Sequence, residues 1–359
     1  MNNLLFSVLR ATIDDVNAPK EQHTLSIEDC RYLLKESQKQ AVDGVAFDGF
    51  CKFATDSESA QDIHRLKLQW IGCAIQLERR NELTNLRAKE LTDFFSSGGY
   101  RSCVLKGQGV SLLYPNPKRR HCGDIDLWIE GERDDIVAFV RSKGINIYDV
   151  HLVHATADFF KDVAVEIHFR PSWMYNPFLD KRLQSFFTSQ ASEQFSQFDE
   201  TVGFAYPTIY FNLVHSMVHI NRHIFEGGIG LRQLMDYYFI LKHSSSEERS
   251  AAYDVLCSVG LTKFVAAVMY VLQEVFLLDG SLMLCVPDST LGTHLLNDVI
   301  CGGNFGRARG YRAGRNRIEK GMLQFIHNTK ILLPYANEAC WIPFFQLWHY
   351  GWRKKHRYL

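Results

Sequence analysis

Hydrophobic residues recur at helical spacing through the first hundred residues of the chain. The first clear helix begins after Ser26, whose hydroxyl group is suited to cap it, and the apolar residues that follow recur three and four positions apart. After a polar connector, the segment 63–97 continues as one long amphipathic pattern that two glycines end. We predict a helical N-terminal domain over residues 1–98.

The pattern changes from helical spacing to short alternating segments after residue 99. Acidic and apolar residues alternate with a period of two in 124–130, as they do in a strand with two different faces. Glycine and proline residues separate short segments that read as strand, helix, strand, helix, strand and strand: 100–107, 108–115, 124–130, 133–144, 148–160 and 164–171. The last two form an expected antiparallel hairpin. We predict a mixed α/β core over residues 99–204.

Helical patterns return from about residue 205. The segments 209–225 and 231–243 flank a glycine-rich turn, and 264–278 reads as a buried helix. We predict a helical C-terminal domain over 205–359. The fold class is therefore α+β, with a small mixed β-sheet core between helical N-terminal and C-terminal domains.

Composition and targeting signals narrow the class of protein. The chain has 359 residues with 40 basic and 40 acidic side chains, a balance that argues against a general polyanion-binding protein but leaves a local basic patch open. The nine cysteines are scattered without a CxxC pair, so we expect reduced thiols rather than a disulfide framework or zinc knuckle. We read no signal peptide at the N-terminus, and the apolar segment 264–278 is too short to cross a membrane. We expect a cytoplasmic protein with no membrane partner.

The strand at 124–130 carries two carboxylates that should share one face. Asp124 and Asp126 are two residues apart, so their side chains project together while Ile125 points to the other side. Two close carboxylates repel each other unless a cation lies between them or one takes a proton. Mg²⁺ suits them, because it prefers oxygen ligands and takes only a few from protein. Glu166, in a similar apolar run, is suited to be the third acid.

A glycine turn precedes this strand. Gly107 and Gly109 lie where a strand should pass into a helix, so backbone N–H groups can approach a phosphate there, and Lys106 adds a positive charge. Arg120, just before the acidic strand, can neutralise phosphate charge. This order suits a protein that grips a nucleoside triphosphate by its tail and holds two divalent ions at the α-phosphate.

The run "LKGQGVSLLYPNPKRRHCGDIDLWI" followed by "VEIHF" resembles the DNA-polymerase-β-like nucleotidyltransferase superfamily, most closely its bacterial, largely uncharacterised branch. The resemblance covers about residues 100–170, and more loosely 218–241. It implies catalytic metal ligands at Asp124, Asp126 and Glu166, and a phosphate-binding turn at Gly107. Gln108, which we also expect to contact the nucleotide, stands where the superfamily usually has Gly or Ser.

The activity implied is in-line attack of an acceptor hydroxyl on the α-phosphorus of a nucleoside triphosphate, with release of pyrophosphate and with Mg²⁺ or Mn²⁺ as cofactor. The acceptor is open between a small molecule, a nucleic acid and a protein, and the sequence does not indicate an oligomeric state. One alternative, which Gln108 favours, is a catalytically inactive nucleotide-sensing or partner-binding protein. Another is a metal-dependent phosphodiesterase or nuclease, although HxH and HD patterns are not found near the acidic strand.

Several histidines have two interpretations. His168, two residues after Glu166, either lines the site and contacts nucleotide or is a core histidine bonded to backbone. We interpret His151 and His154 as structural or surface residues. A further group recurs every four residues on one helix face, and without an HExxH glutamate its packing or substrate contact is favoured over zinc binding: His215, His219 and His223.

Two arginine features also have two interpretations. Arg232 and Asp236 are four residues apart, which predicts an intrahelical ion pair, with an arginine aimed at the site as the alternative. A glycine-rich segment near the C-terminus concentrates arginines that are either solvated or able to close over phosphates or an anionic acceptor: Arg307, Arg309, Arg312, Arg315 and Arg317.

Overall fold

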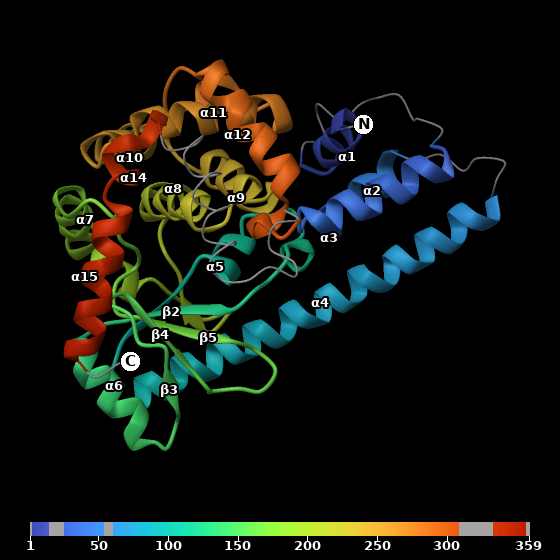
Figure 1. Cartoon of the computed structure of the whole chain (residues 1–359). Coiled ribbons are helices and arrows are strands. Elements are labelled where there is room, and N and C mark those ends of the chain that lie inside the picture. Colours follow the sequence, from blue (N-terminus) through green and yellow to red (C-terminus); the bar gives the residue numbers. More distant parts are fainter. Residues whose placement is uncertain (1, 14–24, 54–59, 309–332, 357–359) are drawn as a thin grey trace.

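The computed structural model of the chain describes residues 2–13, 25–53, 60–308 and 333–356. The N-terminal part is helical, and its last helix runs as a long rod below the preceding helices and on to the sheet (Figure 1). The helices are α1 (Asn2–Ile13), α2 (Ile27–Lys39), α3 (Asp43–Phe53) and α4 (Ala60–Ser97). Ser26 caps α2 by accepting from the Asp29 backbone N–H, while the Asp29 carboxylate accepts from the Ser26 backbone N–H, so the predicted helix start is confirmed.

A five-stranded mixed sheet forms the centre of the chain. Its strands, in the spatial order β1-β2-β5-β4-β3, are β1 (Ser102–Leu105), β2 (Ile125–Ile129), β3 (Ile147–Tyr148), β4 (His154–Ala157) and β5 (Val165–His168). Strands β2 and β5 are parallel, and the other neighbouring pairs are antiparallel. The short helix α5 (Gly107–Ser111) and the turn η1 (Pro117–Arg119) connect β1 to β2, and α6 (Arg133–Ser142) follows β2. The predicted acidic strand and antiparallel hairpin are confirmed.

The two faces of the sheet pack against different helices. Ile125, Leu127 and Ile129 of β2 point into a core shared with Leu91 and Phe95 near the end of α4. The residues between them, including Asp126, therefore point to the opposite face, toward the C-terminal helices. The alternation read from the sequence thus places the acidic side chains on the face away from α4.

Most of the C-terminal helices lie above this second face, while the last one runs down beside the sheet (Figure 1). They are α8 (Ile209–Glu226), α9 (Leu231–Lys242), α10 (Ser246–Ser258), α11 (Thr262–Phe276), α12 (Ser289–Gly302), α14 (Ala336–Ala339) and α15 (Ile342–Lys355), with short turns η2 (Gly280–Leu282), η3 (Asn304–Gly306) and η5 (Leu333–Tyr335). Most residues of α11 are buried, as predicted for this segment. Within the described part of the chain, no helix has both the length and the apolar character needed to cross a membrane.

One helix of twenty residues was not predicted. Helix α7 (Pro177–Ser196) follows the sheet, and a small hairpin of β6 (Phe198–Asp199) and β7 (Phe204–Ala205) comes after it. The start signal was present, because Asn176 caps the helix by accepting from the Phe178 backbone N–H at 3.0 Å and proline occupies the first helical position.

The helices from both ends of the chain share one hydrophobic core. Buried residues of α1 to α3 and the first part of α4 belong to the same cluster as those of α8 to α11. Trp70 of α4 stacks on Phe50 of α3, and Arg10 of α1 donates from Nε to the Val275 carbonyl of α11 at 2.9 Å. The division into domains at residues 98 and 204 stays a prediction.

Candidate active site

Three carboxylates meet on the sheet face that the C-terminal helices cover. Asp126 and Glu166 are direct neighbours in the parallel register of β2 and β5, and Asp124 immediately precedes β2. One carboxylate oxygen from each lies within 4.8 Å of the others. The structure thus brings together the three acids predicted as metal ligands, although their role stays a prediction.

Asp126 is the buried member of the group, and cations hold it ionised. Its Oδ1 accepts from Lys106 Nζ at 2.8 Å and lies 2.9 Å from His168 Nε2. Burial pushes the pKa of Asp126 upward, but Lys106 and His168 outweigh burial and lower it. Both contacts use Oδ1, and no hydrogen bond among the described residues uses Oδ2. Oδ2 is therefore the oxygen that can serve a further cation.

Asp124 carries the electrostatic cost of this arrangement. Asp124 is exposed at the cavity, and the charge of the neighbouring Asp126 is the main cause that raises its pKa to about 6, followed by desolvation and Glu166. A carboxylate held among two others favours either a proton or a positive ion. An all-oxygen donor set of three carboxylates at this spacing fits a hard divalent ion such as Mg²⁺ or Mn²⁺.

The glycine turn lies next to these acids and contains a strained residue. Lys106, the last residue before α5, has φ 54° and ψ −125°, a backbone conformation that favours glycine. Its ammonium group donates to Asp126. The strained backbone of Lys106 therefore occurs where its positive charge meets the acidic group. A Cβ atom on Gly107 would come no closer than 4.0 Å to its nearest neighbours, Arg120 Nη1 and the Asp124 carbonyl. The turn therefore leaves open space that a ligand can enter.

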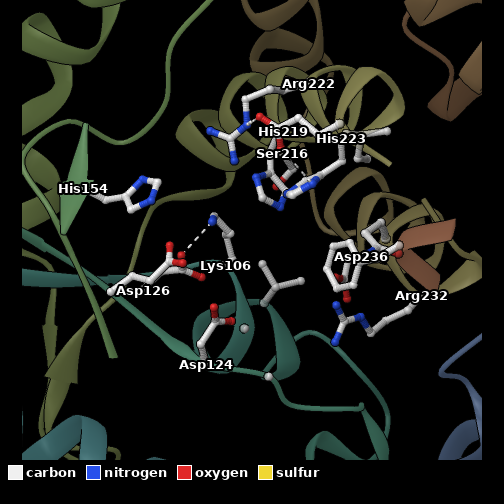
Figure 2. A pocket seen from close by; sticks show the side chains of 18 of the residues that line it. Lys106, Asp124, Asp126, His154, Ser216, His219, Arg222, His223, Arg232 and Asp236 are labelled. Atoms are coloured by element: carbon white, nitrogen blue, oxygen red, sulfur yellow. Dashed lines mark hydrogen bonds and ion pairs between the residues drawn. The ribbon is translucent and has the colours of Figure 1, made fainter. Parts of the chain in front are cut away.

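These residues line one cavity of about 390 Å³, which lies between the sheet and the helices α8 and α9. Figure 2 shows the acids and Lys106 on one side, with Arg222, His219 and His223 facing them from α8 and Arg232 from α9. The volume is in the range of small-molecule sites. Three of its carboxylates lie on the sheet side, whereas the helix side presents two arginines and two histidines together with Glu226 and Asp236.

The predicted ion pair between Arg232 and Asp236 is wrong. Asp236 instead accepts two hydrogen bonds from Arg120, at 2.7 Å from Nε and 2.7 Å from Nη2, and a third from the Tyr114 hydroxyl at 2.7 Å. Arg232 is left to line the cavity and donates from Nη1 to the His121 carbonyl at 3.2 Å. The spacing of four residues favoured Arg232 as the partner of Asp236. In the folded protein, Arg120 from the loop before β2 reaches Asp236 instead and makes a stronger, bidentate contact.

Two residues predicted to contact nucleotide have side chains outside the cavity. Gln108 is only 2% exposed and points to Asn81 of α4, with Nε2 3.4 Å from its Oδ1. His168 is 1% exposed and lies behind the acids, 2.9 Å from Asp126 Oδ1 and 3.4 Å from Glu166 Oε2. Burial lowers the pKa of His168, but these two carboxylates outweigh burial and raise it. Its position suits orienting the acids. By contrast, Lys106, Gly107 and Arg120 do line the cavity.

Sequence reasoning also missed cavity residues. His151 and His154, interpreted as structural or surface residues, both line it. Strand pairing explains the position of His154. Strands β4 and β5 are antiparallel neighbours, and His154 lies directly opposite His168 in their register. Nitrogen and oxygen atoms of His154, Glu166 and His168 lie within 4.8 Å of one another, so this side of the site can also offer imidazole ligands. The signal available was that both strands of the expected hairpin carry a histidine, His154 on one and His168 on the other.

The three histidines of α8 divide between packing and the cavity. His215 is buried, with Nε2 3.1 Å from the Pro171 carbonyl, whereas His219 and His223 line the cavity. Their positions therefore agree with the interpretation favoured from the sequence, in which these histidines pack or contact substrate, and not with a zinc site. Arg307 is exposed. The other arginines of the glycine-rich segment lie outside the described residues: Arg309, Arg312, Arg315 and Arg317.

A small mixed sheet that pairs an acidic strand with a parallel strand carrying a third acid, flanked by helices, is consistent with a nucleotidyltransferase core. The chain belongs to a family described as uncharacterised nucleotidyltransferase, whose model matches residues 27–277. This match confirms the resemblance inferred from the sequence. None of the curated proteins compared with the chain matches it.

Proposed function

We propose that the protein is a Mg²⁺-dependent nucleotidyltransferase that moves a nucleoside monophosphate from a nucleoside triphosphate to an acceptor hydroxyl and releases pyrophosphate. The observation that carries the proposal is the meeting of Asp124, Asp126 and Glu166 beside the open glycine turn, within one cavity. Membership of a nucleotidyltransferase family supports the reaction class. Mn²⁺ is an alternative ion for the same donor set.

Each residue of the sheet side has a distinct proposed role. Asp124, Asp126 and Glu166 would hold the divalent ions, which supply charge stabilisation at the α-phosphate and lower the pKa of the acceptor hydroxyl. Glu166 is partly exposed to the cavity and can accept the hydroxyl proton as it leaves. His168 orients two of these acids from behind.

The glycine turn has the proposed role of holding phosphate oxygens. Gly107 leaves room for close approach, and Lys106 supplies a positive charge at the same turn. Arg120 lines the cavity beside Gly107, but Asp236 compensates its charge, so it contributes shape and an N–H donor more than net charge. The acceptor, whether a small molecule, a nucleic acid or a protein, would enter on the Glu166 side.

A second candidate function is nucleotide sensing without turnover. The observation that favours it is the ion pair of Lys106 with Asp126. This ion pair neutralises a carboxylate that would have to bind a metal ion if the protein is a nucleotidyltransferase. The side chain of Gln108, buried against α4, adds no group to the phosphate turn. Binding without chemistry would follow if Lys106 keeps its place in the nucleotide complex.

The test measures nucleotide turnover and binding together. Labelled ATP, CTP, GTP and UTP are incubated with Mg²⁺ or Mn²⁺, and pyrophosphate release or transfer of label to the protein is followed. The variants are Asp124→Asn/Asp126→Asn and, as a matched control, Asp93→Asn, an exposed aspartate on α4. We expect turnover in wild type and control and its loss in the double variant. Tight binding without turnover supports sensing, and no metal-dependent nucleotide binding contradicts both functions.

A further inference from the structure

Two arginines on the helix side of the cavity have no role in the proposed reaction. Arg222 comes from α8 and Arg232 from α9, and both line the cavity opposite the carboxylates. Figure 2 shows them on either side of His219 and His223. Arg222 is buried and Arg232 is half-buried, so the N–H donors of both need acceptors.

Arg222 is ion-paired with Glu226, but two of its nitrogens make no hydrogen bond among the described residues. Its side chain is only 7% exposed, and its guanidinium carbon lies 3.8 Å from the centre of the Trp173 ring. Glu226 lies nearby, with Oε1 3.3 Å from Nε, yet Nε and Nη1 make no hydrogen bond among the described residues. Glu226 balances the charge of Arg222, but buried donors without an acceptor are costly, so a ligand in the cavity that accepts from them would be favoured.

Arg232 is in a similar state. Its Nη1 donates to the His121 carbonyl, but its buried Nε has no hydrogen-bond partner among the described residues. The carboxylate nearest in sequence, Asp236, already accepts three hydrogen bonds from Arg120 and Tyr114. The guanidinium carbon lies 5.3 Å from the centre of the Phe305 ring, which covers one of its faces. An external anion would supply the missing acceptors.

The histidines between the arginines fit the same interpretation. The rings of His219 and His223 are 4.2 Å apart, and both line the cavity. Burial first, and then the surrounding cations Lys106 and Arg222, lower the pKa of both histidines. They are therefore neutral at pH 7, and each has one N–H to donate. His219 can donate to an oxygen in the cavity, whereas His223 Nδ1 lies 3.4 Å from Glu226 Oε2.

The charges of the whole cavity indicate the class of anion. Four cationic and five carboxylate side chains line it, so divalent ions at the acids would leave it positively charged. Guanidinium groups prefer the geometry of phosphate and carboxylate oxygens, and several such donors converging on one space match a group with many acceptor oxygens. Phosphate, rather than a single carboxylate, meets this condition.

We propose that Arg222 and Arg232, with His219 and His223 between them, form a phosphate-binding wall that faces the carboxylates. The inference rests on the proposed function and adds its substrate chemistry: a phosphate group is gripped from the helix side while the acids act from the sheet side. The phosphate belongs either to the triphosphate tail of the nucleotide or to a phosphorylated acceptor.

The experiment measures binding of three probes by calorimetry in Mg²⁺: tripolyphosphate, a non-hydrolysable ATP analogue, and inorganic phosphate added to protein saturated with that analogue. The proteins are wild type, Arg222→Gln, Arg232→Gln and a control, Arg79→Gln, which alters an exposed arginine on α4. Circular dichroism and thermal unfolding establish that each variant is folded. Arg222→Lys keeps the charge and serves if the glutamine variant does not fold.

We expect wild type and Arg79→Gln to bind tripolyphosphate, and the two wall variants to bind it about tenfold more weakly or worse, because charge-assisted hydrogen bonds are lost. An equal loss for the ATP analogue assigns the wall to the nucleotide tail. Unchanged analogue binding, with inorganic phosphate binding lost, assigns it to a phosphorylated acceptor.

Unchanged affinity of both wall variants for all three probes would overturn the proposal, as would failure of wild type to bind any of them. The proposed function fails separately. If phosphate binding depends on the arginines but no metal-dependent turnover is found, the proposed nucleotidyltransferase activity is contradicted and the phosphate-binding wall is supported. If turnover is found but the wall variants bind all probes normally, only the phosphate-binding wall is contradicted.

Discussion

Arg120 and Asp236 form a buried, two-point ion pair that ties the loop before β2 to α9, with N–O distances of 2.7 Å in both contacts. We predict that Asp236→Asn lowers the free energy of unfolding by about 3–5 kcal/mol, because it leaves an uncompensated buried guanidinium. Urea unfolding followed by circular dichroism measures this. An Arg120→Met/Asp236→Leu double variant should be less destabilised than Asp236→Asn. A loss below about 1 kcal/mol in the single variant would contradict the prediction.

The backbone of Lys106 gives a prediction that separates strain from charge. Lys106→Ala and Lys106→Gly both remove the ammonium group from Asp126, but only glycine adopts φ 54° and ψ −125° without steric cost. The glycine variant should therefore be more stable than the alanine variant by about 1–3 kcal/mol. Chemical denaturation of the two variants measures the difference, and equal stability would show that the turn is not strained.

The two glycines of the turn should respond differently to the same added methyl group. On Gly109 a Cβ atom would lie 2.7 Å from Tyr206 Cβ, whereas on Gly107 the nearest atoms are 4.0 Å away. We expect Gly109→Ala to destabilise the fold by about 1–3 kcal/mol through overpacking. Gly107→Ala should stay close to wild type in stability but bind nucleotide more weakly, because its methyl group enters the space proposed for phosphate. Thermal unfolding and nucleotide titration of both variants test this contrast.

The raised pKa of Asp124 predicts how metal binding depends on pH. Its folded-state pKa is about 6, so a proton occupies it below that pH and a cation must displace the proton. Apparent Mg²⁺ affinity should be flat above pH 7 and fall by up to about tenfold per pH unit below pH 6. Asp124→Asn should bind Mg²⁺ more weakly and lose this dependence. Calorimetric titrations between pH 5 and pH 8 measure both.

The same shift has a defined effect on stability. Because folding raises the pKa of Asp124, its ionised form destabilises the fold above pH 6, and this cost disappears as the pH falls below that value. In Asp124→Asn the cost is absent throughout. The stability difference between variant and wild type should therefore be larger at pH 8 than at pH 5, and a difference that does not change with pH would contradict the assignment.

The acidic centre was accessible from the sequence because it depends on local rules. Alternation along β2 fixes which side chains share a face, and a hairpin of expected length brings Glu166 beside Asp126. The glycine turn was visible for the same reason. What these residues do stays a prediction, but their proximity followed from strand geometry and the family resemblance.

The helix side of the cavity was not accessible in the same way. Asp236 lies four residues after Arg232, so local spacing chose that pair, yet Asp236 bonds with Arg120 from 116 positions away. His154 and Arg222 enter the cavity because of how β4 and α8 pack, which no short-range pattern records. Helix α7 is a different case, since its capping asparagine and the proline after it are local start signals that the sequence itself carries.

The common core of the helices from both ends of the chain has a practical consequence. The family match covers residues 27–277, so α1 and α12 lie outside it. Helix α1 packs on α3 and α11. Helix α12 packs so closely on α11 that a Cβ atom on Gly292 would lie 2.3 Å from Tyr270. A chain trimmed to the matched region would expose the apolar surface that these helices cover. The limits of the family match are therefore not the limits of a unit that folds by itself. A protein shortened to residues 27–277 should aggregate, because apolar surface would be exposed.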